Sequence, residues 1–184
     1  MQELREEDRD LSRILFTREE IAARVKELGE EISRNCAGQE LFMVCILKGA
    51  CIFFADLMRA VTIPVRIGFM SASSYGAGVF SSGEVKLGGL SFPVEGKNIL
   101  IVEDIIDTGN SLCALKRFLT ERGAASVKIC AFLDKESRRT ADVAVDFVGY
   151  AIEDEFVVGY GLDYAERYRG LPYIGILKRE VYEK

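Results

Sequence analysis

Three apolar runs of strand length, each followed by a loop or a helical pattern, constrain the fold of this chain more than any other feature. They are ELFMVCILKG (40–49), NILIVEDIID (98–107) and SVKICAFLD (126–134). A strand that is apolar on both faces is typical of a parallel sheet buried between helices. Segments 50–61 and 110–123 have helical patterns, and VRIGFMSA (65–72) and VDFVGYAI (145–152) read as further strands. This alternation predicts an α/β fold with a mostly parallel twisted sheet flanked by helices.

The two ends of the chain extend this prediction. Segment 17–32 predicts an amphipathic helix, because Thr17 and Glu20 have capping-box spacing and four apolar residues share one helical face: Ile21, Val25, Leu28 and Ile32. The tail 156–178 has two strand-like runs with no good helix between them, which predicts a small lobe beside the sheet. Residues 71–92 are rich in Gly and Ser, and so long a loop in one domain is usually functional or disordered.

Composition narrows the chemistry. The formal net charge is −5, and the lysines and arginines are scattered, so a nucleic-acid partner is disfavoured. The chain has no histidine, which excludes Ser-His and Cys-His nucleophilic pairs and the usual zinc sites. A metal should therefore be a hard cation on oxygen ligands, most plausibly Mg²⁺.

The cysteines and the hydropathy pattern concern the location of the protein. Five cysteines are widely spaced and form no CxxC pair, so they fit buried apolar positions in a reducing compartment: Cys36, Cys45, Cys51, Cys113 and Cys130. The start, MQELREEDRD, is too charged for a signal peptide, and no apolar run reaches the roughly 20 residues that span a bilayer. We therefore expect a cytoplasmic protein with no membrane partner.

The stretch ILIVEDIIDTGNSL (99–112) carries three carboxylates at the end of a buried strand, on Glu103, Asp104 and Asp107. Ligands bind outside the carboxyl ends of parallel strands, so these acids are placed where a ligand would lie. They suit hydrogen bonds from sugar hydroxyls, magnesium held through water, or the acceptance of a proton. Neither a GxxxxGK[ST] loop nor a GxGxxG fingerprint occurs, which excludes the familiar nucleotide motifs.

The residues that follow predict a phosphate site. The helix after Asp107 offers amides without an internal partner and the positive end of its dipole. Thr108 and Ser111 add hydroxyl donors, and Gly109 allows close approach of the backbone. The alternative is that Asp107 or Thr108 simply caps the helix.

The same stretch resembles the phosphoribosyl pyrophosphate (PRPP) motif of type I phosphoribosyltransferases. Five further segments resemble the hypoxanthine-guanine phosphoribosyltransferases in the expected order, over nearly the whole chain: LFTREEI, ILKGACIFFADLMRA, SSYG, AFLDKESRR and FVVGYGLDYAERYRGLPYIGIL. The resemblance implies one phosphoribosyltransferase domain over 1–184, with a core at about 36–150 and a small hood lobe from the N-terminal segment and about 151–184.

Function follows from this resemblance as an expectation. Family members transfer ribose 5-phosphate from PRPP to a 6-oxopurine, hypoxanthine or guanine, and release pyrophosphate in purine salvage, giving IMP or GMP. They require Mg²⁺ and form homodimers or homotetramers.

The resemblance also implies roles on the PRPP side. Glu103 and Asp104 match the acids that address the ribose hydroxyls and, mostly through water, the metal, and Asp107 matches the general base that faces purine N7. Four residues match the 5-phosphate cradle: Thr108, Gly109, Asn110 and Ser111. Some relatives carry lysine where this chain has Asn110, a difference of one charge-assisted contact.

The remaining roles lie outside the motif. On the purine, Lys135 matches the donor to O6, Phe156 the stacking aromatic and Val157 a backbone contact to the ring edge. A lysine donor to O6 favours 6-oxopurines over adenine, whose amino group would leave it unpaired. Alone, Lys135 would read as a solvated lysine and Phe156 as a core residue.

Pyrophosphate and metal contacts complete the set. Asp163 matches a direct magnesium ligand, and Arg169 matches the pyrophosphate contacts together with the backbone of Lys48 and Gly49. The family often has a cis peptide bond before that lysine, here Leu47–Lys48. Ser74 and Tyr75 match the start of a mobile loop that closes over the reaction centre.

Three rival functions are disfavoured, the first by the acidic charge balance and the second by the position of the acid pair at Glu103 and Asp104. A regulator that keeps this fold and binds RNA should show a basic face. A receiver-type signalling domain should have its acid pair after the first strand of a chain of roughly 120 residues. A phosphoribosyltransferase for another base is disfavoured by Lys135 and by the 156–169 segment.

Overall fold

The computed structural model describes residues 6–71 and 92–183, which form two sheets. The larger sheet has five parallel strands in the order β3-β2-β4-β5-β6. These strands are β2 (Leu41–Leu47), β3 (Val65–Ser71), β4 (Asn98–Ile106), β5 (Ser126–Asp134) and β6 (Phe147–Ala151). The helices are α1 (Arg18–Asn35), α2 (Cys51–Ala60), α4 (Asn110–Glu121) and α5 (Arg179–Tyr182), with 3-10 turns η1 (Glu6–Asp10) and η2 (Glu136–Arg138). The expected α/β fold with a parallel sheet is confirmed.

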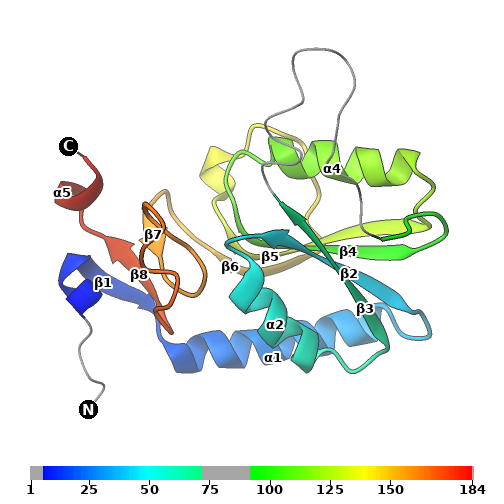
Figure 1. The fold of residues 1–184 in the computed structure, drawn as a ribbon, viewed down its shortest axis with the longest axis horizontal. Coiled ribbons are helices and arrows are strands. Elements are labelled where there is room, and N and C mark those ends of the chain that lie inside the picture. Colours follow the sequence, from blue (N-terminus) through cyan, green and yellow to red (C-terminus); the bar gives the residue numbers. More distant parts are fainter. Residues whose placement is uncertain (1–5, 72–91, 184) are drawn as a thin grey trace.

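Helices cover both faces of this sheet, with α1 and α2 on one face and α4 on the other (Figure 1). The apolar run of β4 serves both layers because successive side chains point to opposite faces. Leu100 and Val102 pack in the core on the side of α1 and α2, whereas Ile99 and Ile101 pack in the core beneath α4. The run is continuous because neither face of the strand meets water.

Helix α1 forms as its sequence predicts. Thr17 is the N-cap, and its side chain and that of Glu20 complete the capping box. The buried face includes Ile21, Val25, Leu28 and Ile32, as expected from the spacing. A Cβ added to Gly29 would lie 2.5 Å from the Cβ of Ala60, so α1 and α2 approach closely there.

The smaller sheet joins the two ends of the chain. Its antiparallel strands are β1 (Leu11–Phe16), β7 (Val157–Val158) and β8 (Ile174–Leu177), in the order β1-β8-β7. Figure 1 shows these strands and α5 beside the main sheet, which confirms the expected hood lobe. The periodicity of the chain predicted neither β1 nor α5. Half of the residues of β1 are exposed, and α5 spans four residues.

The register of the large sheet brings four carboxyl ends to one edge. Leu47 at the end of β2 pairs with Ser71 at the end of β3, and Ile106 of β4 pairs with Asp134 of β5. The segments that follow β2, β4 and β5 therefore meet at this edge, and they carry most of the candidate site residues.

The described helices and the five cysteines bear on two predictions from the sequence. None of the described helices is both long and apolar enough to span a bilayer. All five cysteines are free thiols, of which Cys36, Cys45 and Cys130 are buried, whereas Cys51 and Cys113 are exposed. Burial raises the pKa of the Cys45 thiol to about 12, so this cysteine is an inert apolar residue.

Candidate active site

The acid pair lies half-buried at the end of β4. Burial raises the pKa of Glu103 well above its ordinary value, and the charge of Asp104 raises it further. Burial also raises the pKa of Asp104, although the amide of Ile105, which donates to Asp104 Oδ1 at 2.8 Å, and the charge of Arg169 both act to lower it. Two confined carboxyls of this kind favour a nearby proton or cation.

The turn after β2 presses against this pair. The Leu47–Lys48 peptide bond is cis. A Cβ added to Gly49 would lie only 1.6 Å from Asp104 Oδ2, so only glycine fits there. On its other side, a Cβ added to Gly161, whose φ is +104°, would lie 2.1 Å from the carbonyl oxygen of Gly49. The turn is thus held between the acid pair and the hood.

The start of α4 has the features of an anion site. Its N-cap is Gly109, with a left-handed φ of +79°, and no side chain caps the helix. The alternative in which Asp107 or Thr108 caps the helix is therefore wrong. The first amides of α4 have no partner within the helix, as at any helix N-terminus, and they are suited to a phosphate.

A loop after β5 supports this turn. The amides of Thr140 and Ala141 both donate to the Thr108 carbonyl oxygen at 3.1 Å, and Asn110 Nδ2 donates to Thr140 Oγ1 at 3.2 Å. A Cβ on Gly109 would lie 2.9 Å from Val143 Cγ1. Loop 135–143 thus fixes the backbone of the phosphate turn, whereas Ser111 is exposed at the start of the helix.

A chain of four charges connects the expected general base with the expected purine lysine. Arg138 pairs with Asp107 Oδ1 through Nε and with Asp154 Oδ2 through Nη1, the latter at 3.1 Å. Asp154 Oδ1 accepts from Lys135 Nζ, also at 3.1 Å. The Lys135 side chain is 12% exposed, so it is not the solvated lysine of the alternative reading.

A buried ion pair braces the same loop from beneath. Asp134 is 3% exposed, and both of its carboxylate oxygens accept from Arg139: Oδ1 from Nε at 3.2 Å and Oδ2 from Nη2 at 2.8 Å. Arg139 Nη1 donates to the Val143 carbonyl oxygen at 2.8 Å. This pair ties the end of β5 to the segment that packs on Gly109.

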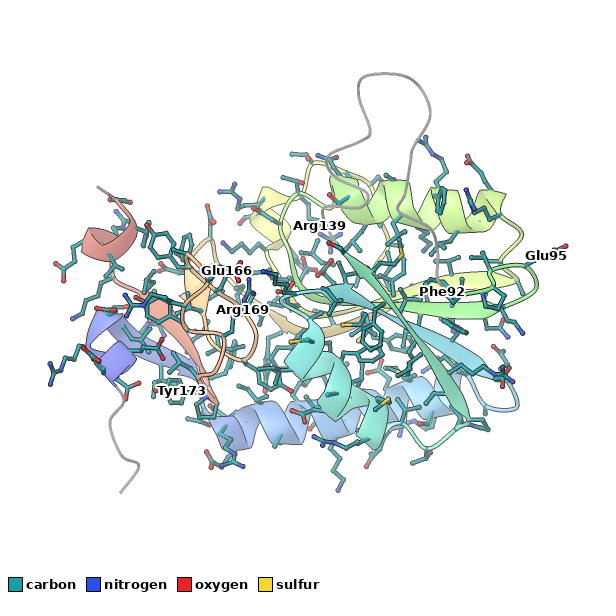
Figure 2. The ribbon with its side chains drawn as sticks, in the orientation of Figure 1. Phe92, Glu95, Arg139, Glu166, Arg169 and Tyr173 are labelled. Carbon is teal, nitrogen blue, oxygen red and sulfur yellow. The ribbon has the colours of Figure 1, made fainter. Side chains whose placement is uncertain are left out.

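Arg169 lies in the hood and makes several polar contacts. It donates to the Gly161 carbonyl oxygen at 2.8 Å and to Glu166 Oε1 at 3.3 Å, and its Nη2 forms an ion pair with Asp163 Oδ1 at 2.8 Å. Figure 2 shows Glu166 and Arg169 next to each other, on the side of the hood that faces the sheet. Arg169 Nε is buried and has no hydrogen-bond partner among the described residues, which is the signature of a missing acceptor.

The aromatic candidate packs within the hood. Phe156 is half-buried, stacks on Tyr182 with a centroid distance of 4.7 Å, and meets Tyr164 edge-on at 5.6 Å. Val157 is buried in β7. These ring contacts hold Phe156 within the hood, whereas Lys135, directly after β5, pairs with Asp154.

The predicted site and the described structure differ in two ways. Ser74 and Tyr75 lie outside the described residues. Within 6–71 and 92–183, no group of three or more carboxyl or thiol side chains is placed to hold a metal. Sequence reasoning missed the charged partners of the candidates: Asp134, Arg138, Arg139, Asp154 and Glu166. The Arg-Arg pair in DKESRR was a visible signal for two of them.

The chain is similar to known proteins over nearly its whole length. The model of the phosphoribosyl transferase domain family matches residues 13–165. The hypoxanthine-guanine phosphoribosyltransferase of Bacillus subtilis is 50% identical over 175 residues, covering 95% of this chain and 97% of that protein. That of Streptococcus thermophilus is 44% identical over 178 residues, covering 96% and 99%. A crystal structure of a hypoxanthine phosphoribosyltransferase from Staphylococcus aureus superposes with a TM-score of 0.91 at 43% identity, covering 100% of both chains.

Proposed function

The chain belongs to the hypoxanthine-guanine phosphoribosyltransferase family of type I phosphoribosyltransferases, and we propose that the residues around the carboxyl end of β4 carry out its reaction. The enzyme transfers the 5-phosphoribosyl group to hypoxanthine or guanine in purine salvage. The observation that carries the site proposal is the meeting of an acid pair, an uncapped helix start and a glycine turn at one sheet edge. The receiver-domain alternative is wrong, because the family match covers most of the chain.

PRPP binds with its 5-phosphate on the first turn of α4. Backbone amides and the hydroxyls of Thr108 and Ser111 supply the donors, and the glycine at the N-cap allows the left-handed φ of +79° from which the helix starts. Glu103 and Asp104 then accept hydrogen bonds from the ribose hydroxyls. As the bond to pyrophosphate breaks, positive charge develops on the sugar, and these carboxylates stabilise it.

Mg²⁺ fits the donor set. Magnesium usually keeps several waters and takes one or two carboxylates plus substrate phosphate oxygens, so it needs no cluster of three protein ligands. Asp163 is the direct carboxylate ligand that we assign to it, and Glu103 and Asp104, whose pKa values are raised by burial, would accept hydrogen bonds from its waters. When bound, the ion neutralises charge on the leaving pyrophosphate.

Pyrophosphate is held between the turn after β2 and the hood. Lys48 and Arg169 supply positive charge, and the Gly49 backbone comes close because this residue has no side chain. Arg169 Nε, which is buried without a partner among the described residues, would gain a phosphate oxygen as its acceptor. These contacts balance the charge of the leaving group.

The purine lies against loop 135–143 and the hood. Lys135 donates to O6 of the base, and Asp107 accepts the proton at N7. Arg138 occupies Asp107 Oδ1, so we assign Oδ2 to the purine. Phe156 stacks on the base, and the Val157 backbone contacts its edge. A charged donor at O6 disfavours adenine, since the lysine would face another donor.

A spectrophotometric assay tests this proposal. Hypoxanthine, guanine, xanthine, adenine, uracil and orotate are offered separately with PRPP and magnesium, alongside an Asp107→Asn variant and a metal-free control. We expect turnover of 6-oxopurines alone, lost without metal and sharply reduced in the variant. Turnover of adenine or a pyrimidine would overturn the assignment of Lys135, and binding of PRPP without turnover of any base would favour a regulator.

Three further expectations stay predictions. A homodimer or homotetramer and a cytoplasmic location rest on family resemblance and on the free cysteines. The division into a core at about 36–150 and a hood also remains a prediction. Helix α1 lies before residue 36 in the chain, but it packs with α2 against the large sheet.

A further inference from the structure

Glu166 joins the two cations assigned to pyrophosphate. Its Oε2 accepts from Lys48 Nζ at 3.0 Å, and its Oε1 lies 3.3 Å from Arg169 Nη2. Both Glu166 and Lys48 are about two-thirds exposed, at 66% and 68% of their side chains. The Glu166 carboxylate thus lies between Lys48, which follows β2, and Arg169 in the hood. The negative charge of the leaving pyrophosphate would occupy the same position.

The backbone holds Glu166 in this place. Tyr164 and Arg167 exchange two backbone hydrogen bonds, at 3.3 and 3.0 Å, so residues 164–167 form a tight turn. Ala165 and Glu166 at its tip have φ values of +50° and +63°, a region that residues other than glycine rarely adopt. The Glu166 amide also donates to Asp163 Oδ2 at 2.9 Å. Such a conformation persists only where the surroundings fix it, and such outliers cluster at ligand sites.

The charges around Glu166 indicate what happens when pyrophosphate binds. Lys48 and Arg169 face Glu166 and Asp163, so the cluster is neutral before any substrate binds. A pyrophosphate group brings several negative charges to the same two cations. Glu166 would then lie beside an anion of like charge, which weakens its pairing with both cations.

We propose that Glu166 is an internal competitor for the pyrophosphate position: its carboxylate holds Lys48 and Arg169 in the free protein and yields them when PRPP or pyrophosphate binds. This inference rests on the proposed roles of Lys48 and Arg169. Its consequence is weaker binding of pyrophosphate, which favours release of the leaving group after the transfer. Glu166 touches the ligand-binding cations rather than the reacting atoms, so it is a positioning residue.

The exchange is feasible because exposed ion pairs are weak, whereas charge-assisted hydrogen bonds to phosphate are stronger. Glu166→Gln keeps the shape of the side chain and removes its charge. We therefore expect the variant to bind magnesium pyrophosphate roughly threefold to tenfold more tightly than the wild type, a range set by the weakness of such pairs.

Isothermal titration of the full chain with magnesium pyrophosphate measures this directly. Glu30→Gln is the matched control, because it removes the same charge from α1, where Glu30 lies 4.0 Å from Arg34. The inhibition constant of pyrophosphate against PRPP gives a second readout. The dissociation constant from titration and the inhibition constant should both be lower in Glu166→Gln than in the wild type. In Glu30→Gln both should stay near the wild-type value.

Lys48→Met separates failure of this inference from failure of the proposed function. It should weaken pyrophosphate binding, and Glu166→Gln should have a smaller effect in its background because the two residues are coupled. If Lys48→Met binds pyrophosphate as the wild type does, the role proposed for Lys48 fails. If it binds weakly but Glu166→Gln is unchanged, weaker, or matched by Glu30→Gln, only the competitor inference fails.

Discussion

Replacing each of two adjacent arginines, Arg138 and Arg139, by methionine should affect different properties of the enzyme. Arg139 makes a two-fold contact with a carboxylate that is 3% exposed, on Asp134. Arg138 is exposed and pairs with Asp107 and Asp154 at the site. We expect Arg139→Met to destabilise the protein, and Arg138→Met to change catalysis with little loss of stability.

The magnitude follows from burial. Removing one partner of a buried ion pair leaves an uncompensated charge, which costs about 3–5 kcal/mol. For a chain of this size, each kcal/mol lowers Tm by roughly 2–4 °C, so Arg139→Met should lower Tm by roughly 6–20 °C. Adding Asp134→Asn should restore part of the loss, because it removes the stranded charge. Exposed pairs contribute little, which is why Arg138→Met should retain near-native stability.

Urea denaturation of the four proteins, followed by circular dichroism, gives the free energies of unfolding, and steady-state assays give kcat/KM. The reasoning is refuted if Arg139→Met loses no more stability than Arg138→Met, or if Asp134→Asn worsens the Arg139→Met variant. Either result would mean that the Asp134–Arg139 pair is solvated in practice and does not brace the loop beneath Gly109.

Three further perturbations test separate parts of the structure. Gly49→Ala should lower the free energy of unfolding by roughly 1–3 kcal/mol and abolish PRPP binding, because the added Cβ would overlap Asp104. Urea denaturation and titration with PRPP check this. Glu103→Gln should raise the Tm of the ligand-free protein at about pH 8 and change it little at about pH 4, while activity falls. Burial raises the pKa of Glu103, so the folded state holds its proton more tightly than the unfolded state, and stability is lost as pH rises above the unfolded value of about 4.3; thermal melts across pH would contradict this if the variant were less stable at high pH. Thr17→Ala should cost about 1 kcal/mol through the lost N-cap of α1 and leave kcat/KM unchanged, which a melt and an assay on one preparation can check.

The sequence predicted the parts of the fold in which local pattern and burial agree. The continuous apolar run of β4, the capping box at Thr17 and the glycine before α4 are local features, and each lies where expected. Strand β1 escaped prediction because its partner, β8, is remote in the chain and its own pattern does not alternate clearly.

The candidate site was predictable only in its motif residues. The positions of Glu103, Asp104 and Lys135 at strand ends follow from the chain order and the parallel sheet. The pairing of Lys48 with Glu166, which lie 118 residues apart, depends on how the hood docks, and no local signal in the sequence specifies it. The spacing of Asp134 and Arg139 is short, but their contact depends on the path of the loop between them.

The hood sheet imposes an order on synthesis. Strand β1 leaves the ribosome early, yet its antiparallel partner β8 begins at Ile174. All five strands of the parallel sheet lie between them in the chain, so that sheet can form while β1 still has no partner. Arg169 and Phe156 are made after all five strands of that sheet. A nascent chain that has completed the start of α4 therefore still lacks Arg169, the residue proposed to contact pyrophosphate.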